Sequence, residues 1–350
     1  MSSLPLYVGS FFGSDKAPIY RCEFNSDSGD ITICEEYRDS RPSWLCKAES
    51  SDRLFFVREA ESIDGVYGGG VGSFFGDMQS PVLLGIGASG PCHLCERDGN
   101  LFLACYREGA LVEARWLGED FCREVKIIRH EGSSVDPVRQ SQAHPHFSLF
   151  TPDGKFLVVC DLGLDKIFFY PYDRACGISG EPIAYPTEEG RGPRHAVFSA
   201  DGRYLYVITE MGGTILAYEY DGLGGINLIS EITVMLRSEM GGEAQCAAIR
   251  LSPTGEELIA TERRSGSIVF FAVYKNGMLS REGVLPTDAF PRDAVFSPDG
   301  RWILVANQQA DTVGVYSYSA DRSIPLKSRV KLHKSVKLPE NSAPCALLFV

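Results

Sequence analysis

Residues 192–210 read Gly-Pro-Arg-His-Ala-Val-Phe-Ser-Ala-Asp-Gly-Arg-Tyr-Leu-Tyr-Val-Ile-Thr-Glu. Residues 192–199 and 203–210 are strand-type segments, and Ala200-Asp-Gly202 between them is a typical hairpin turn. Two more apolar segments, residues 214–220 and 226–232, follow after glycine-containing turns. The stretch therefore predicts a four-stranded antiparallel meander.

The same hairpin recurs along the chain at a nearly constant interval. Its turns lie at Ser50-Ser51-Asp52, Asp98-Gly99, Asp153-Gly154, Asp201-Gly202, Thr254-Gly255 and Asp299-Gly300. A repeat of roughly 50 residues built from strand-type segments is typical of a ring of β-blades.

Six complete blades are predicted, and the two chain ends supply a seventh. The six span residues 42–87, 91–128, 145–184, 192–232, 246–285 and 291–332. Residues 343–350 have the pattern of a first strand, while residues 7–10, 19–24 and 31–37 are strands that lack one. Joining them in one blade closes the ring and removes exposed sheet edges. We therefore expect an all-β, seven-bladed β-propeller with four antiparallel strands per blade, forming a single domain over residues 1–350; the alternatives are a β-sandwich or a parallel solenoid.

Composition and charge narrow the function classes. The chain holds 34 Lys and Arg against 46 Asp and Glu, a net charge of −12, which disfavours binding to nucleic acid or to an anionic membrane surface. No apolar stretch is long enough to cross a bilayer, and the first residues lack the basic and apolar regions of a signal peptide, so a cytoplasmic location is expected. The oligomeric state is left open.

The eleven cysteines are an odd number scattered through apolar runs, a distribution typical of reduced core thiols in a cytosolic protein. The single Cys-x-x-Cys, Cys92 to Cys95, falls in a predicted strand. Side chains three apart in a strand point to opposite faces, about 10 Å apart, so we expect neither a disulfide nor a shared metal there.

The repeat also predicts where a functional site lies. Residues seven before and nine after the turn residue are cross-strand neighbours at one rim of the central channel. They are His146 in blade three, Arg194 and Glu210 in blade four, Ala247 and Arg263 in blade five, Arg292 and Gln308 in blade six, and Ser43 and Glu59 in blade one. In blade two the hairpin is one residue shorter, and His93 with Tyr106 or Arg107 falls there approximately.

These rim positions are mostly polar and differ from blade to blade, whereas the rest of each repeat is apolar and alike, which indicates a site. Arginines at one rim repel one another unless an anion compensates them, so a small anionic lactone or carboxylate is the expected partner. Arginines also oppose a dication, and no metal is expected. Structural alternatives remain: a capped turn at His144 and His146, a structural Arg194–Glu210 ion pair, and a solvated Arg263–Arg264 pair.

Five segments in order resemble the lactonase family of seven-bladed propellers, which contains 6-phosphogluconolactonases and carboxymuconate lactonizing enzymes. They are residues 139–146, 192–195, 207–210, 261–263 and 296–308, which include Gln-Ala-His-Pro-His, Gly-Pro-Arg-His, Ile-Thr-Glu, Thr-Glu-Arg and Ser-Pro-Asp-Gly. The likeness covers essentially the whole chain. The family's active-site residues match His146, Arg194, Glu210 and Arg263. The chain departs from the family pattern at Ala247-Ala248 and Cys105-Tyr106, which bears on the substrate more than on the fold.

The resemblance implies an enzyme of carbohydrate metabolism, a metal-independent and cofactor-free sugar-lactone hydrolase most like 6-phosphogluconolactonase. Such chemistry needs a base for water and a positive group for the oxyanion. His146 or Glu210 is the candidate base, and Arg194 and Arg263 are the candidate anion and oxyanion partners. The expected substrate-binding residues are Arg292, Gln308, Glu59, His93 and His195. The alternatives are a carboxymuconate lactonizing enzyme and a non-catalytic propeller that binds a ligand or a protein.

Overall fold

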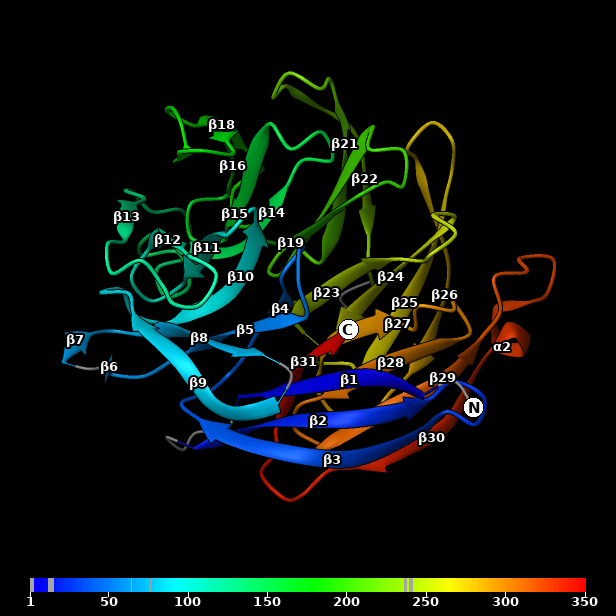
Figure 1. The fold of residues 1–350 in the computed structure, drawn as a ribbon. Helices are drawn as coiled ribbons and strands as arrows, with labels where there is room; N and C mark the ends of the chain where they lie inside the picture. The colour runs from blue at the N-terminus through cyan, green and yellow to red at the C-terminus, as the bar shows by residue number, and fades with distance from the viewer. Residues whose placement is uncertain (1–2, 12–15, 64, 76, 236–237, 239–241) are drawn as a thin grey trace.

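The computed structural model describes residues 3–11, 16–63, 65–75, 77–235, 238 and 242–350. In these ranges the chain forms seven antiparallel sheets arranged as a ring of blades, which confirms the predicted propeller (Figure 1). The first strand of each blade is innermost and contacts the first strands of the two neighbouring blades. The sheets therefore surround one central channel.

The strands of each blade follow in chain order from the channel outward. Blade one contains β4 (Leu45–Lys47), β5 (Arg53–Arg58), β8 (Gly70–Phe75) and β9 (Asp77–Gly85); blade two contains β10 (Pro91–Arg97), β11 (Asn100–Cys105), β12 (Ala110–Arg115) and β13 (Lys126–Arg129); blade three contains β14 (Pro145–Phe150), β15 (Phe156–Asp161), β16 (Lys166–Asp173) and β18 (Ile183–Pro186). Blade four contains β19 (Pro193–Phe198), β20 (Tyr204–Thr209), β21 (Thr214–Tyr220) and β22 (Ile226–Thr233); blade five contains β23 (Cys246–Leu251), β24 (Glu257–Glu262), β25 (Ser267–Val273) and β26 (Leu279–Pro286); blade six contains β27 (Pro291–Phe296), β28 (Trp302–Asn307), β29 (Thr312–Tyr318) and β30 (Val330–Lys337).

Blade seven joins the two ends of the chain, as predicted. It consists of β31 (Pro344–Phe349), β1 (Ser3–Ser10), β2 (Ala17–Asn25) and β3 (Asp30–Asp39). The C-terminal β31 pairs with β1 in antiparallel register, with Val8 opposite Leu347. The ring is closed by main-chain hydrogen bonds between segments more than 300 residues apart, which join the two ends of the chain in one sheet.

Short elements lie outside the four-stranded pattern of the blades. A small strand, β17 (Gly177–Ile178), pairs with the outer end of β16, and a short helix, α2 (Leu326–Arg329), precedes β30. A two-stranded hairpin, β6 (Ser62–Ile63) and β7 (Val66–Tyr67), lies in the connection between β5 and β8. None of the helices in the described ranges is long and apolar enough to cross a bilayer.

The recurring turn is closed by its own side chains. In blade four the Ser199 hydroxyl donates to Asp201 Oδ1 at 2.7 Å, and the same oxygen accepts the Arg203 N–H. Gly202 follows with φ +72°, a left-handed conformation that glycine adopts without steric cost. Local chemistry thus makes each hairpin, which is why the repeat was readable in the sequence.

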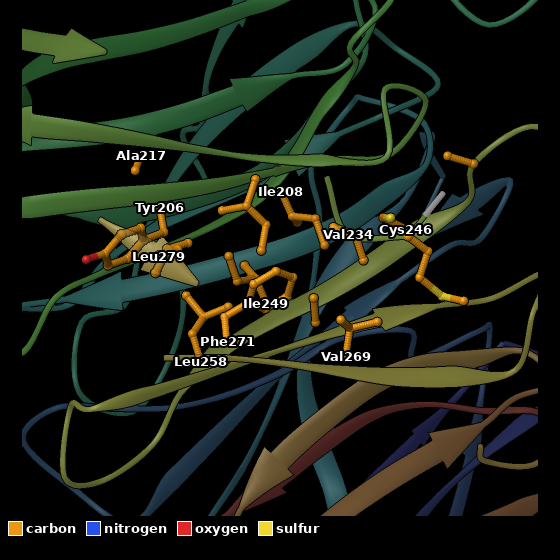
Figure 2. Packing of buried hydrophobic residues seen from close by; sticks show 14 of the residues in the cluster. Tyr206, Ile208, Ala217, Val234, Cys246, Ile249, Leu258, Val269, Phe271 and Leu279 are labelled. Carbon is orange, nitrogen blue, oxygen red and sulfur yellow. The ribbon is translucent and has the colours of Figure 1, made fainter. Parts of the chain in front are cut away.

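The core lies between adjacent blades. The second strands β11, β20, β24 and β28 are buried along their whole length because another blade covers each of their faces. Between blades four and five, Tyr206 and Ile208 of β20 pack toward Ile249 and Leu258 of β23 and β24 (Figure 2). Burial of such side chains contributes about 1.5–3 kcal/mol each, so the blade interfaces stabilise the ring and hold the channel rim in place.

Candidate active site

Two positions that recur in several blades build one mouth of the channel. The first is a β-bulge at the start of the innermost strand, where the pairing register skips a residue directly after proline. The bulged residues are Cys92, His146, Arg194 and Arg292. The second position opens the connection after the second strand and carries Glu59, Tyr106, Glu210, Arg263 and Gln308. Bulges redirect side chains next to functional sites, and here they do so around one rim.

The mouth contains a pocket of about 270 Å³. Its lining residues are Phe11, Glu59, Gly90, Cys92, Tyr106, Arg107, Arg139, His146, Glu210, Arg263 and Arg292. Seven candidate rim residues thus line one cavity: Glu59, Tyr106, Arg107, His146, Glu210, Arg263 and Arg292. The other four lining residues are Phe11, Gly90, Cys92 and Arg139.

Glu210 is the electrostatic centre of this pocket. Its Oε2 accepts a hydrogen bond from Arg194 Nε at 2.8 Å, and its Oε1 lies 2.5 Å from Arg139 Nη2 and 2.9 Å from Arg263 Nη2. Burial alone would raise the pKa of this carboxyl, but the guanidiniums of Arg263, Arg194 and Arg139 outweigh it and hold the pKa well below 4.5. Glu210 therefore remains a carboxylate that binds three arginines and is a weak proton acceptor.

Arg194 lies beneath the pocket and supports its floor. Its side chain is 2% exposed. Besides Glu210, it donates through Nη1 to the carbonyl of Ala247 at 2.9 Å and to His195 Nε2 at 3.0 Å. The predicted Arg194–Glu210 cross-strand pair exists, and its position below the lining residues fits a positioning group rather than one that meets a ligand.

His146 is the group in this pocket best suited to accept a proton. Burial, reinforced by the nearby Arg194 charge, lowers the pKa of its imidazole well below 6.5. Its Nδ1 is buried and has no hydrogen-bond partner among the described residues. The ring is therefore neutral near pH 7 and retains a basic nitrogen.

Arg292 and Glu59 complete the opposite side of the pocket. The Arg292 guanidinium lies 4.7 Å from the Phe11 ring centroid, and its Nη1 is 3.4 Å from Gln308 Oε1. Glu59 accepts the Ser43 hydroxyl at 3.0 Å, and its other oxygen is 3.8 Å from Arg107. Gln308 thus orients Arg292 and does not itself line the pocket.

The structure places His93 and His195 one layer below the pocket, not in it. His93 packs against Trp44 at 4.3 Å and Phe147 at 4.0 Å between ring centroids, while His195 accepts the Arg194 hydrogen bond. Both are 3% exposed. In blade two the bulge falls on Cys92, so the equivalent of His146 is Cys92, and the expectation based on turn spacing was one residue off. A bulge is a tertiary pairing feature that turn spacing alone cannot locate.

The Cys92-x-x-Cys95 segment lies in β10, as expected. The Cys92 thiol is 3.5 Å from the His146 carbonyl oxygen, whereas the Cys95 thiol is 3.3 Å from Ser148 Oγ. Burial raises the pKa of Cys92 to about 12. Although it lines the pocket, its sulfur is a neutral thiol and a poor nucleophile.

Arg139 is a pocket residue that the turn spacing did not place at the rim, whereas the spacing did place Tyr106 or Arg107 there. Arg139 stands in the loop between blades two and three, where the Asp136 carboxylate accepts its backbone N–H at 2.8 Å. The same loop is tied to blade three through Gln140 Nε2, which donates to the Leu162 carbonyl at 2.9 Å. Its place within residues 139–146, a segment that resembles the family, was the signal that could have identified it. Strand register could not, because Arg139 lies outside the strands.

His144 has a structural role. Its Nδ1–H donates to the Tyr106 carbonyl at 2.6 Å, and its ring stacks on that tyrosine at 4.1 Å.

Ala248 and Cys105, where the chain departs from the family pattern, are buried and do not line the pocket. In the described part of the chain, no cluster of three or more His, Cys, Asp or Glu side chains could hold a metal ion.

The pocket carries an excess of positive charge. Its lining contains Arg107, Arg139, Arg263 and Arg292, with Arg194 bound behind Glu210, against the carboxyls of Glu210 and Glu59. In a chain with net charge −12, this local reversal of sign indicates a site for an anion. Planar guanidiniums suit a carboxylate, a phosphate or a developing oxyanion.

Comparison with known proteins gives a consistent picture. The family described as lactonase, 7-bladed beta-propeller, matches residues 5–338. The structure of a periplasmic gluconolactonase from Pseudomonas aeruginosa superposes with a TM-score of 0.88 at 28% identity, covering 100% of this chain and 99% of that one. Fold and sequence thus agree over the whole chain.

Among curated proteins, a 6-phosphogluconolactonase from Bacillus subtilis is 27% identical over 242 residues, which is 65% of each chain. An uncharacterized protein from Staphylococcus epidermidis is 32% identical over 190 residues, 54% of each chain. The chain thus spans from about half to about two thirds of the length of these curated relatives.

Proposed function

The chain belongs to the lactonase family of seven-bladed β-propellers, and from this we propose that it hydrolyses a sugar lactone, in the manner of a 6-phosphogluconolactonase. The observation that carries the proposal is the pocket in which neutral His146 stands beside arginines gathered around Glu210. A base next to guanidiniums is what ester hydrolysis of an anionic substrate requires. We propose that the chain acts as a single propeller domain.

In the proposed mechanism, His146 takes a proton from water as the water oxygen bonds to the lactone carbonyl carbon. The carbonyl oxygen becomes an oxyanion, which a guanidinium of Arg263 or Arg292 stabilises. When the intermediate collapses, the bond between that carbon and the ring oxygen breaks, and the imidazolium returns its proton to the leaving alkoxide. Water is consumed, and an open-chain aldonic acid is formed.

Glu210 acts in this scheme as a positioning residue. Its carboxylate holds Arg139 and Arg263 at the pocket wall, while Arg194 anchors it from below. The two candidate bases differ in their hydrogen-bond partners. Both oxygens of the Glu210 carboxylate already bind guanidiniums, whereas His146 Nδ1 has no partner among the described residues, so we propose His146 as the base.

The purified protein is expected to hydrolyse 6-phosphoglucono-1,5-lactone faster than the unphosphorylated lactone, because the arginines favour an anionic substrate. Acid release is followed in weak buffer with an indicator dye, in the presence of EDTA, since the surrounding guanidiniums oppose a dication. The screen includes 3-carboxymuconate, whose cyclisation would favour the lactonizing alternative. Absence of any turnover would favour a binding propeller.

The pH profile of kcat/KM is expected to show no decline near pH 6.5, where a histidine with an ordinary pKa would become protonated. Because the pKa of His146 lies well below 6.5, the free base persists as pH falls through the ordinary histidine range. kcat/KM should therefore stay nearly constant from about pH 8 to pH 6 and fall only at lower pH. A decline centred near pH 6.5, after correction for spontaneous lactone hydrolysis, would contradict this assignment.

We further propose that this reaction takes place in the cytoplasm. In support, the eleven cysteines carry free thiols, which suits a reducing compartment. The partner is then a small-molecule lactone of carbohydrate metabolism.

A further inference from the structure

Blade one differs from blades two to six in the connection between its second and third strands. The corresponding connections of blades two to six each contain four residues: 106–109, 162–165, 210–213, 263–266 and 308–311. In blade one the connection is residues 59–69, eleven residues long. Four residues suffice to join these strands in five blades, so the additional residues are not required by the fold.

The additional residues form the β6–β7 hairpin, which is seated firmly on blade one. Ile63 is 4% exposed and lies against Gly70, where no side chain competes for the space. A Cβ atom on Gly85, the cross-strand partner of Gly70, would lie only 2.9 Å from Val66 Cβ. The Gly68 N–H donates to the Glu61 carbonyl at 2.8 Å. The hairpin therefore packs against blade one in a defined position.

This hairpin walls a second pocket, of about 510 Å³, that opens from the central one. The two pockets share Glu59, Gly90 and Arg107. Beyond these, the hairpin segment contributes Glu61, Ser62 and Tyr67. Tyr67 is 67% exposed, so an aromatic ring stands at the surface on a fixed support, next to the candidate active site.

The two pockets differ in chemistry. The central pocket presents several arginines, whereas the second presents carboxylates of Glu59 and Glu61, hydroxyls of Ser62 and Ser89, and the Tyr67 ring, with Arg107 at their boundary. Carboxylates and hydroxyls accept hydrogen bonds from sugar hydroxyls, and the C–H face of a pyranose packs on an aromatic ring. A second anionic group would meet repulsion there, whereas an uncharged sugar would not.

We propose that the second pocket is a subsite for an additional sugar residue, so that the enzyme acts better on the lactone of a disaccharide or longer aldonic acid than on the corresponding unphosphorylated monosaccharide lactone. The lactone ring occupies the central pocket, and the attached sugar extends past Glu59 and Arg107 onto Tyr67. The inference rests on the proposed function for its choice of lactone, and it adds a size class of substrate.

The kinetic test compares glucono-1,5-lactone with cellobiono-1,5-lactone. In the wild-type protein, kcat/KM is expected to be about tenfold higher for the disaccharide lactone, and Tyr67→Ala should remove most of this ratio. Tyr274→Ala, a control at a half-exposed tyrosine of blade five, should leave the ratio unchanged. Equal kcat/KM for the two lactones, or a ratio insensitive to Tyr67→Ala, would overturn the subsite.

A binding measurement separates this inference from the proposed function. Calorimetric titration with the stable aldonates gluconate and cellobionate requires no turnover. Cellobionate is expected to bind to the wild-type protein about tenfold more tightly than gluconate does. The Tyr67→Ala variant is expected to bind the two aldonates with equal affinity. The subsite is overturned if the wild-type protein binds both aldonates with equal affinity or does not bind cellobionate, even if lactones are hydrolysed. If cellobionate is preferred but no lactone is hydrolysed, only the proposed reaction is refuted.

Discussion

Replacement of His146 by alanine is expected to lower kcat for lactone hydrolysis by about 10²–10⁴-fold, the usual contribution of a positioned general base. Near pH 7 the imidazole is neutral because burial and the Arg194 charge disfavour its protonated form. Two other pocket groups are less suited to this role: the Glu210 carboxylate is held by arginines, and the Cys92 thiol stays protonated.

The measurement is kcat for 6-phosphoglucono-1,5-lactone, with thermal unfolding recorded alongside to confirm that the variant folds. His146→Gln serves as a second variant that retains a polar group of similar volume. His333→Ala provides the control, because His333 is exposed on β30 and contacts Trp302 at the outside of the ring. A kcat within about threefold of wild type in folded His146→Ala would exclude it as the base.

Replacement of Glu210 by glutamine is expected to destabilise the folded protein by about 3–5 kcal/mol, the cost of removing one partner from a buried ionic group. Arg194 and Arg263, 2% and 9% exposed, would then face a neutral amide and one another. The repulsion should also displace Arg139 and Arg263 from the pocket wall and reduce kcat/KM.

Urea unfolding measures the loss in stability, and Glu219→Gln, at an exposed position on β21, is the control with a change within about 0.5 kcal/mol. The difference between wild type and Glu210→Gln also depends on pH. Because the folded-state pKa of Glu210 is depressed, its stabilising effect is fully present above about pH 4.5 and is lost as pH falls through the folded-state pKa. The two unfolding curves should converge in acid.

Activity distinguishes the roles of this group. If Arg194 and Glu210 form only a structural pair, Glu210→Gln will lose stability and keep its turnover. If Glu210 positions the substrate-binding arginines, kcat/KM will fall while the pH profile keeps its shape, since the base is unchanged. Unaltered stability in Glu210→Gln would contradict the three-arginine cluster itself.

Much of the fold could be predicted because its signals are local. The turn at Asp201-Gly202 is closed by side chains within five residues, and the apolar run of β20 follows from burial on both faces of the blade. The constant offsets from the turns at Asp153 and Asp201 also predict that His146, Arg194 and Glu210 lie at one rim. Cross-strand neighbours in a hairpin are determined by their distance from its turn.

Features that depend on contacts between distant segments could not be predicted from the sequence. Arg139 lies 71 residues from Glu210 and reaches it from a loop that has no register, so no periodicity could pair them. The bulge that puts Cys92 rather than His93 at the rim depends on strand pairing, and the pocket beside Tyr67 depends on where the β6–β7 hairpin settles on blade one. The repeat, the ring and the common rim follow from local turn and strand chemistry, so they could be predicted from the amino-acid sequence alone. The binding of Glu210 by three arginines and the lowered pKa of the His146 imidazole depend on charges and burial contributed by several blades at once, so they arise only in the folded chain.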